Sequence, residues 1–249
     1  MKKLLSLALV LVLGYGIISH LDGNDSFTKY GEAEVENRVS DRYLDKNVTE
    51  DNSSADFGDE ELETGSANFV TSIVANYRSF DTLGEVTVLF ISAFGVALLL
   101  ATTNQRRLEL NFKPNFMLKV GSRALFGIII MTGLYVAIHG HLTPGGGFPG
   151  GAMIASSILL LYLSDDSFRT KIKGFKLLES VMGSLYVLIG IAGLFLAGGY
   201  FLQNFLGTGV VGELFSAGLI PIIYVIIGLK VGSEIASIID NFLSEEVQR

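Results

Sequence analysis

The residues most able to do chemistry are Lys230 and Glu234, which interrupt the apolar stretch 214–241. They are four residues apart, so in a helix they share a face and can pair. Gly228 and Gly232 lie about 160° from Lys230 and form a Gly-x-x-x-Gly surface for close helix packing. If the stretch crosses a membrane, each ionisable side chain costs about 2.5–3.5 kcal/mol and marks an ion path by default. The pair is therefore either a proton or sodium relay, which we favour, or a static ion pair that fixes helix packing.

Acidic residues form a second set of candidates at the start of the apolar stretch 86–103. Glu85 directly precedes this stretch and follows Asp81 by four residues. A carboxylate there is either part of an ion path or a helix N-terminal acid, which the helix dipole favours. Both interpretations stay open. Glu179 lies beside a basic loop, and we expect it to be an interfacial charge that snorkels to the membrane surface.

Two histidines, His139 and His141, precede a run of five glycines between residues 145 and 151. Imidazoles titrate near neutral pH and can pass protons where carboxylates stay ionised. The alternative, which the spacing favours, is that they hydrogen-bond a tight loop. Irregular backbone at membrane depth is tolerated only when it is buried in protein or lines a cavity. We therefore expect the glycine run to pack against other subunits or to line a polar cavity.

The rest of the sequence argues against an enzyme active site in this chain. The 249 residues include no cysteine, which excludes disulfides, thiolate metal sites and cysteine nucleophiles. The sequence contains no phosphate-binding loop, dinucleotide fingerprint, nucleophile elbow or zinc motif. The 18 basic and 25 acidic side chains give no basic surface for nucleic acid. We expect no catalytic residue, no metal site and no bound cofactor.

The elements that must position these residues are membrane helices. Charged residues make up 17% of the chain and the mean hydropathy is +0.49, whereas soluble domains are about 25% charged. The first of six apolar stretches is either a retained helix, which we favour, or a secretory signal. The fourth is short and needs the glycine run to cross a bilayer, which takes about 20 residues. The sequence predicts an all-α integral membrane protein with about six transmembrane helices, near residues 4–20, 86–103, 123–138, 151–163, 177–201 and 214–241.

The charges between these stretches orient the helices. Basic side chains gather in two segments, 104–123 and 164–176. Six alternating spans place both segments, and both chain termini, on the cytoplasmic side of the cell membrane, as the positive-inside rule requires. Residues 22–63 carry 14 acidic and 4 basic side chains and then fall outside. We interpret them as a solvated linker, with a cation-concentrating surface as the alternative.

A further helix is predicted after this acidic segment. Apolar residues recur with helical spacing from Phe69 to Phe80. The opposite face is too polar for a span, so we expect an extracytoplasmic helix lying at the membrane interface. Thr64 or Ser66 is the expected N-cap, and Asp81 and Gly84 are expected to end the helix before the second span.

Two motifs carry a resemblance to a known family. Residues 121–163, centred on His-Gly-His-Leu-Thr-Pro-Gly-Gly-Gly-Phe, resemble the B subunit of Mrp-type multisubunit sodium/proton antiporters. Residues 70–100, with Tyr-Arg-Ser-Phe-Asp-Thr-Leu-Gly-Glu, resemble the C-terminal segment of the large A subunit, which is a separate small subunit in related membrane-bound hydrogenases. Pro149 stands where the family has glutamine. The domains expected from the two motifs are a first helix (1–21), the acidic segment (22–63), an A-subunit-like part (64–104) and a four-helix B-subunit-like domain (105–249).

The resemblance implies a membrane subunit that contributes to sodium/proton translocation in a hydrogenase-type or sulfur-reducing respiratory complex. It supports Glu85, His139 and His141, which match the family's motifs, whereas Lys230 and Glu234 lie outside them; Asp81 is a further ion-translocation candidate. The implied partners are other antiporter-module subunits, redox subunits of such a complex, membrane lipid, Na+ and H+. The alternatives are a subunit of a stand-alone Mrp antiporter and a structural scaffold. The absence of an internal repeat argues against an independent transporter.

Overall fold

The computed structural model describes residues 2–22, 43, 57–58, 60, 62–100, 105–107, 114–165, 168 and 172–246. The chain forms two units, Met1–Asp45 and Lys46–Arg249, and each is described by itself. The first unit contains α1 (Lys2–Asp22), whose leucine content favours a helix. The predicted first span, 4–20, lies within α1, and its crossing of a membrane stays a prediction. Most of the acidic segment 22–63 lies outside the described residues.

The second unit contains five helices that are long and apolar enough to cross a membrane. Their positions confirm five of the six predicted spans, and the described chain is essentially helical, as predicted. The helices are α4 (Ser79–Leu100), α5 (Phe116–Ile138), α6 (Gly147–Ser164), α7 (Ile172–Leu196) and α8 (Ile220–Phe242).

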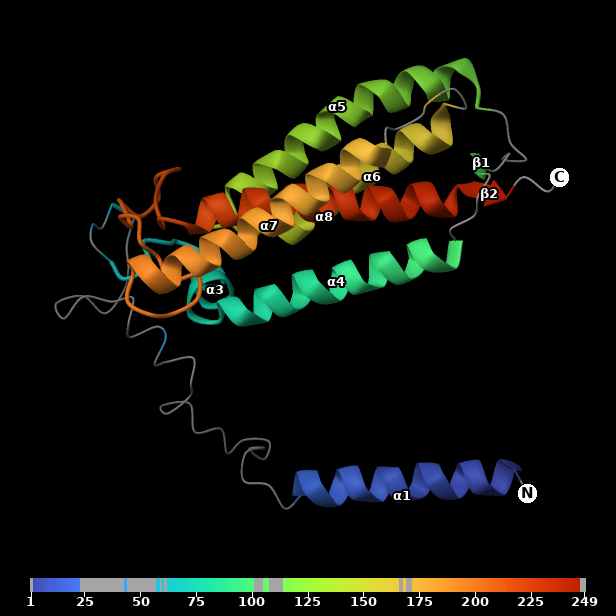
Figure 1. Ribbon diagram of the computed structural model, residues 1–249, viewed down its shortest axis with the longest axis horizontal. Helices are drawn as coiled ribbons and strands as arrows, with labels where there is room; N and C mark the ends of the chain where they lie inside the picture. The colour runs from blue at the N-terminus through green and yellow to red at the C-terminus, as the bar shows by residue number, and fades with distance from the viewer. Residues whose placement is uncertain are drawn as a thin grey trace. The chain divides into compact units, whose positions relative to one another are not determined.

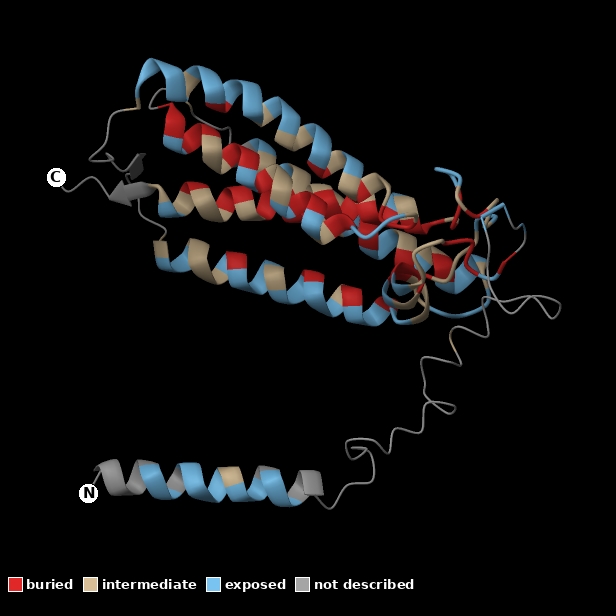
Figure 2. Ribbon diagram, turned by 180° about the vertical axis from the view of Figure 1, so that it is seen from behind, coloured by how far each residue is buried: buried red, intermediate tan, exposed pale blue. Residues whose placement is uncertain are grey.

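The helix α8 is the centre of this bundle and packs against α4, α5, α6 and α7 (Figure 1). Most of α8 is buried, whereas α4 and α5 present exposed faces along their length (Figure 2). A helix that is apolar nearly all round is stable only inside a bundle or a membrane. The central position of α8 explains why its ionisable residues are buried.

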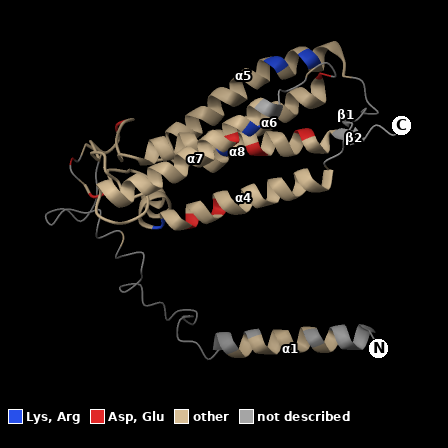
Figure 3. Ribbon diagram, in the orientation of Figure 1, with Lys and Arg blue, Asp and Glu red and all other residues tan. Residues whose placement is uncertain are grey.

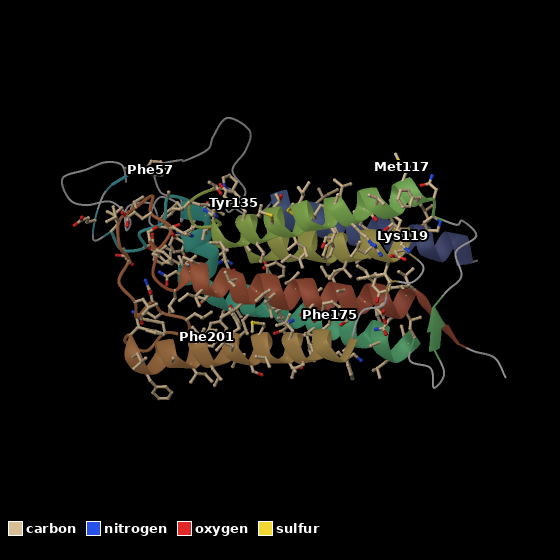
Figure 4. The ribbon with its side chains drawn as sticks, turned by 90° about the horizontal axis from the view of Figure 1, so that it is seen from above. Phe57, Met117, Lys119, Tyr135, Phe175 and Phe201 are labelled. Atoms are coloured by element: carbon tan, nitrogen blue, oxygen red, sulfur yellow. The ribbon has the colours of Figure 1, made fainter. Side chains whose placement is uncertain are left out.

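Successive helices run in opposite directions, so the connections gather at two ends of the bundle (Figure 1). At one end, Asp165 pairs with Lys119 and Arg123 at 2.7 Å each. The short strands β1 (Gln105–Arg107) and β2 (Ser244–Glu246) pair antiparallel there. Figure 4 shows Met117 and Lys119 at this end and Tyr135 toward the other. The α5–α6 and α7–α8 connections meet at that opposite end.

The short fourth span is completed by glycines that enter the helix. The helix α6 begins at Gly147, so only Gly145 and Gly146 remain in the loop. Gly146 has a φ of +136°, a backbone conformation that favours glycine. Pro149 lies in the first turn of α6, where its missing N–H breaks no hydrogen bond. The glycine run is thus mostly helix, rather than the loop that the sequence suggested.

The predicted helix 69–80 is interrupted at a different place. It consists of α3 (Phe69–Ser72) and the π-helical turn η1 (Ile73–Tyr77). In the π turn the Arg78 N–H donates to the Ile73 carbonyl at 2.8 Å. The Val74 carbonyl, which an α-helix would pair with that N–H, instead accepts from Thr82 Oγ1 at 2.7 Å. The chain breaks at Arg78 (φ −121°, ψ 40°) and restarts as α4.

Two predictions for this region are therefore wrong. Asp81 and Gly84 do not end a helix, because both lie inside the first turns of α4. The N-cap is Asn68 rather than Thr64 or Ser66, and it makes no side-chain cap. The location of α3 and η1 at a membrane interface stays a prediction.

Candidate functional site

A buried ion pair lies in the middle of α8. Lys230 Nζ is 2.6 Å from Glu234 Oε2, and the two side chains are 5% and 0% exposed. The residues are one turn apart, as their spacing predicts. Charged positions are otherwise scarce along the spans (Figure 3). A pair this deep keeps its charges only because each compensates the other.

Neighbouring helices complete the surroundings of Lys230. Its Nζ donates to the Val86 carbonyl of α4 at 3.4 Å and lies 5.8 Å from the centre of the Phe90 ring. On α7, a Cβ at Gly183 would lie 3.6 Å from Lys230 Cε, so the aliphatic part of the lysine side chain packs against α7 at a position that has no side chain. Three helices, α4, α7 and α8, therefore surround the Lys230 side chain.

The opposite face of α8 carries the predicted close packing. Built Cβ atoms on Gly228 and Gly232 would lie 3.3 Å from Ala137 Cβ and 3.2 Å from the Gly151 carbonyl. Further along α8, Asp240 accepts a hydrogen bond from the Tyr162 hydroxyl of α6. One face of α8 thus docks on α5 and α6, and the other presents the ion pair toward α4 and α7.

The acidic candidates of α4 lie at different distances from this pair. Glu85 is exposed and directly precedes Val86, whose carbonyl accepts from Lys230 Nζ. Among the residues that the structure describes, Glu85 makes no ion pair. Asp81 instead forms a half-exposed pair with Arg78 at 2.6 Å, and such pairs contribute about 0–1 kcal/mol. Glu85 therefore borders the Lys230 region, and Asp81 belongs to the surface.

The two histidines hold the loop after α5. His139 Nδ1 lies 3.0 Å from the Tyr135 carbonyl, and its ring stacks on Tyr135 at 4.0 Å. His141 is fully buried, with Nε2 3.4 Å from the Glu213 carbonyl. Burial lowers the pKa of His141 below its ordinary value, and the nearby His139 adds to this. Both rings bond backbone, as expected of residues that stabilise a tight loop.

The backbone of this histidine loop is held by the segment before α4. Asn68 N–H and Ser66 Oγ donate to the His141 carbonyl at 2.9 and 2.8 Å. Asn68 Nδ2 and Thr71 Oγ1 donate to the Gly140 carbonyl at 2.9 and 2.7 Å. The loop also packs on α8, because Gly140 and Gly146 lie against the ring of Tyr224. Within this chain the glycine region packs against α8, and its expected packing against other subunits or a polar cavity stays a prediction.

Two carboxylates lie near the site beyond the candidates favoured from the sequence. Glu179, expected to be an interfacial charge, lines both cavities, the one beside Lys230 and the one beside Ser237; that expectation stays a prediction. Asp240 was given no role although it lies inside the last predicted span. The signal for Asp240 was its position inside the last predicted apolar stretch. The surroundings of Glu179 depend on how α4 packs, which no local pattern indicates.

Two family models match consecutive parts of the chain. Residues 33–108 match the family described as the E subunit of MBH, and residues 117–237 match the domain related to the MnhB subunit of Na+/H+ antiporter. The boundary between the matches falls between α4 and α5. The chain belongs to the MnhB-related family of antiporter subunits. It is a multi-pass membrane protein.

Relatives of known sequence support this assignment. An uncharacterised protein of Methanocaldococcus jannaschii is 32% identical over 195 residues, covering 66% of this chain and 72% of that protein. The B subunit of the Na(+)/H(+) antiporter of Alkalihalophilus pseudofirmus is 44% identical over 57 residues, covering 22% of this chain and 40% of that protein. This chain therefore spans less than two thirds of the antiporter relative.

Two solved structures contain chains of similar fold. A chain of the membrane-bound sulfane sulfur reductase, an archaeal respiratory membrane complex, is 42% identical with a TM-score of 0.76; the match covers 98% of this chain and 99% of that one. A chain of the Mrp complex from Dietzia sp. DQ12-45-1b has a TM-score of 0.67 at 24% identity, over 97% of this chain and 26% of that one. The second likeness shows the fold alone.

Proposed function

We propose that this chain is a membrane subunit of a sodium/proton antiporter-type module in a respiratory membrane complex, and that it takes part in ion translocation. The family supports the module, and the near-complete match to a chain of the sulfane sulfur reductase supports the respiratory setting. Its partners are other subunits of that module, redox subunits of the complex and membrane lipid. We infer that both termini are cytoplasmic, because six alternating spans then place both basic segments of the sequence on the cytoplasmic side.

The observation that carries this proposal is the buried pair of Lys230 and Glu234. A charge pair of this depth is expensive to retain and is often neutral to replace with apolar residues. It contacts α4 through Val86, which belongs to the part matching the MBH family, while α8 belongs to the MnhB-related part. An ion that changes the charge of this pair therefore alters the contact between the two parts.

The test replaces the pair by neutral residues of similar shape. A double variant, Lys230→Met with Glu234→Gln, leaves no buried charge uncompensated and should assemble into the complex. We expect sodium-dependent proton transport in proteoliposomes to fall by about 10²-fold, the lower end of the range that is typical of losing a positioned proton-transfer group. Lys119→Ala is the matched control, because it removes a lysine paired with a carboxylate at the end of the bundle.

Two results would contradict the proposal. Full transport in an assembled double variant would show that the pair carries no ion. Reduced assembly, with normal transport per assembled complex, would show that the pair has a structural role in assembly and carries no ion.

A further inference from the structure

A groove runs along the face of α8 that carries the ion pair. It comprises two cavities, of about 350 and 260 Å3, between α4, α7 and α8. Lys230 lines the larger cavity and Ser237 the smaller one. Both cavities are lined by Phe90, Glu179 and Ser180, so they adjoin one another. The groove therefore leads from Lys230 toward the end of the bundle where α7 begins.

Glu179 lies on the wall of this groove, one turn before Gly183. Residues four apart share a helical face, and Gly183 is the residue over which the Lys230 stem passes. The helices α7 and α8 run in opposite directions (Figure 1). The step back from Gly183 to Glu179 on α7 therefore goes toward the same end of the bundle as the step forward from Lys230 to Glu234 on α8. The two carboxylates thus lie on the same side of Lys230.

Polar atoms without partners continue this path. Glu234 Oε1 and Ser237 Oγ are buried and have no hydrogen-bond partner among the described residues. Ser237 is 7% exposed and lines the smaller cavity together with Glu179 and Lys176. Carboxylate and hydroxyl oxygens are the donors that hard cations prefer. The groove thus holds one unsatisfied hydroxyl oxygen, Ser237 Oγ, and Glu234 Oε1 is unsatisfied beside the Lys230 side chain that lines the larger cavity.

We propose that Glu179 is a second ion-exchanging carboxylate, which carries a proton or Na+ between the α7 end of the groove and the pair of Lys230 and Glu234. This rests on the proposed function. In the proton step, the Glu179 carboxyl loses its proton and the Glu234 carboxylate gains it, while Lys230 keeps its charge. Lys230, released from its ionised partner, is then attracted to the Glu179 carboxylate across Gly183.

The first experiment asks whether the groove is wet in the assembled complex. The chain has no cysteine, so single cysteines can be placed at Ser180, on the groove, and at Leu188, an exposed position of α7. We expect a charged, membrane-impermeant thiol reagent to label Ser180→Cys but not Leu188→Cys, above the background of the parent complex. Labelling of Ser180→Cys by apolar reagents alone would show a lipid-filled groove and overturn the proposal.

The second experiment measures transport. Glu179→Gln should assemble normally and lower sodium-dependent proton transport by about 10²-fold, whereas Glu179→Asp should keep most of it. Transport measured at varied pH and, separately, at varied Na+ concentration distinguishes H+ from Na+. Glu179→Gln raises the Na+ concentration for half-maximal transport only if Na+ binds Glu179. If Glu179→Gln transports normally while the double variant of Lys230 and Glu234 is inactive, the role of Glu179 is refuted and the proposed function stands. If both variants transport normally, the proposed function fails as well.

Discussion

Single residues show two ways in which this chain keeps polar groups inside an apolar bundle. Lys230 and Glu234 pair directly, with Nζ and Oε2 2.6 Å apart. His141 instead bonds a backbone carbonyl, and its burial favours the neutral imidazole. A buried charge pair can respond to a cation, while a buried neutral imidazole responds to acid.

The stability of the histidine loop should therefore depend on pH. The folded-state pKa of His141 lies below its ordinary value of 6.5, so between these two values the unfolded chain binds more protons. The stability that neutral His141 contributes is complete above about pH 6.5 and is lost as the pH falls through the folded-state pKa.

The thermal unfolding midpoint of the complex, measured from about pH 7.5 to about pH 5.5, checks this. We expect His141→Asn to have a shallower fall than the wild type toward acidic pH. All other titrating groups are common to both proteins, so parallel curves would refute the assignment.

The sequence predicts some of these residues well and others not at all. The spacing of Lys230 and Glu234 is enough to define their pairing, because both lie on one helix. Their depth follows from the length of the apolar stretch. Glu179 is different, since its distance from the pair depends on the packing of α7 and α4 around α8. Local periodicity contains no information about that packing.

At the scale of elements, α8 is a helix with two different faces. Its glycine face meets the glycines of α6, where built Cβ atoms of Gly147 and Gly151 would lie 2.7 Å and 2.6 Å from backbone carbonyls of α8. Small residues allow backbones to approach this closely in membrane helices. The close contact fixes the rotation of α8, and that rotation directs Lys230 toward α4 and α7.

Gly151→Ala should therefore destabilise the bundle by about 1–3 kcal/mol, the usual cost of overpacking. Gly127→Ala is the matched control, because a Cβ at Gly127 meets nothing within 4 Å. The thermal unfolding midpoint in detergent should fall for the first variant and not for the second. An equal effect of both would mean that the α6–α8 contact does not limit stability.

The elements themselves were largely predictable, and the exceptions have local causes. The spans follow from runs of apolar residues, and five were found where expected. The end of α3 was misplaced because the sequence contains no sign of the π turn at Ile73–Tyr77. That turn exists because Thr82 satisfies the carbonyl that the turn frees. Asn68 likewise bonds a distant loop instead of capping its own helix.

At the scale of the whole molecule, the MBH-related and MnhB-related parts are joined by polar contacts at one end. Asn68 and Thr71 of the first part donate to the Gly140 carbonyl of the second. At the same end, Ser79 Oγ donates to the Phe201 carbonyl at 2.9 Å, and the Phe80 and Phe201 rings pack with their centroids 5.1 Å apart. The two parts therefore form one structure in unit Lys46–Arg249.

Removing the first of these contacts should loosen the histidine loop. In Asn68→Ala with Thr71→Val, each lost hydrogen bond costs about 0.5–1.5 kcal/mol. Amide hydrogen exchange in residues 139–146 should become faster. Thr87→Val is the control, because Thr87 bonds the carbonyl of Leu83 in its own helix. Unchanged exchange would show that the side-chain bonds to the Gly140 carbonyl do not limit the opening of the loop.

The attachment of Asn68 and Thr71 to the histidine loop has a consequence for assembly. Because both partners belong to one polypeptide, their encounter is intramolecular and occurs at an effective concentration that reaches the millimolar range for short tethers. Contacts too weak to recruit a separate small protein from the bilayer are then sufficient. The two parts are also synthesised in equal number, so neither is left in the membrane without its counterpart.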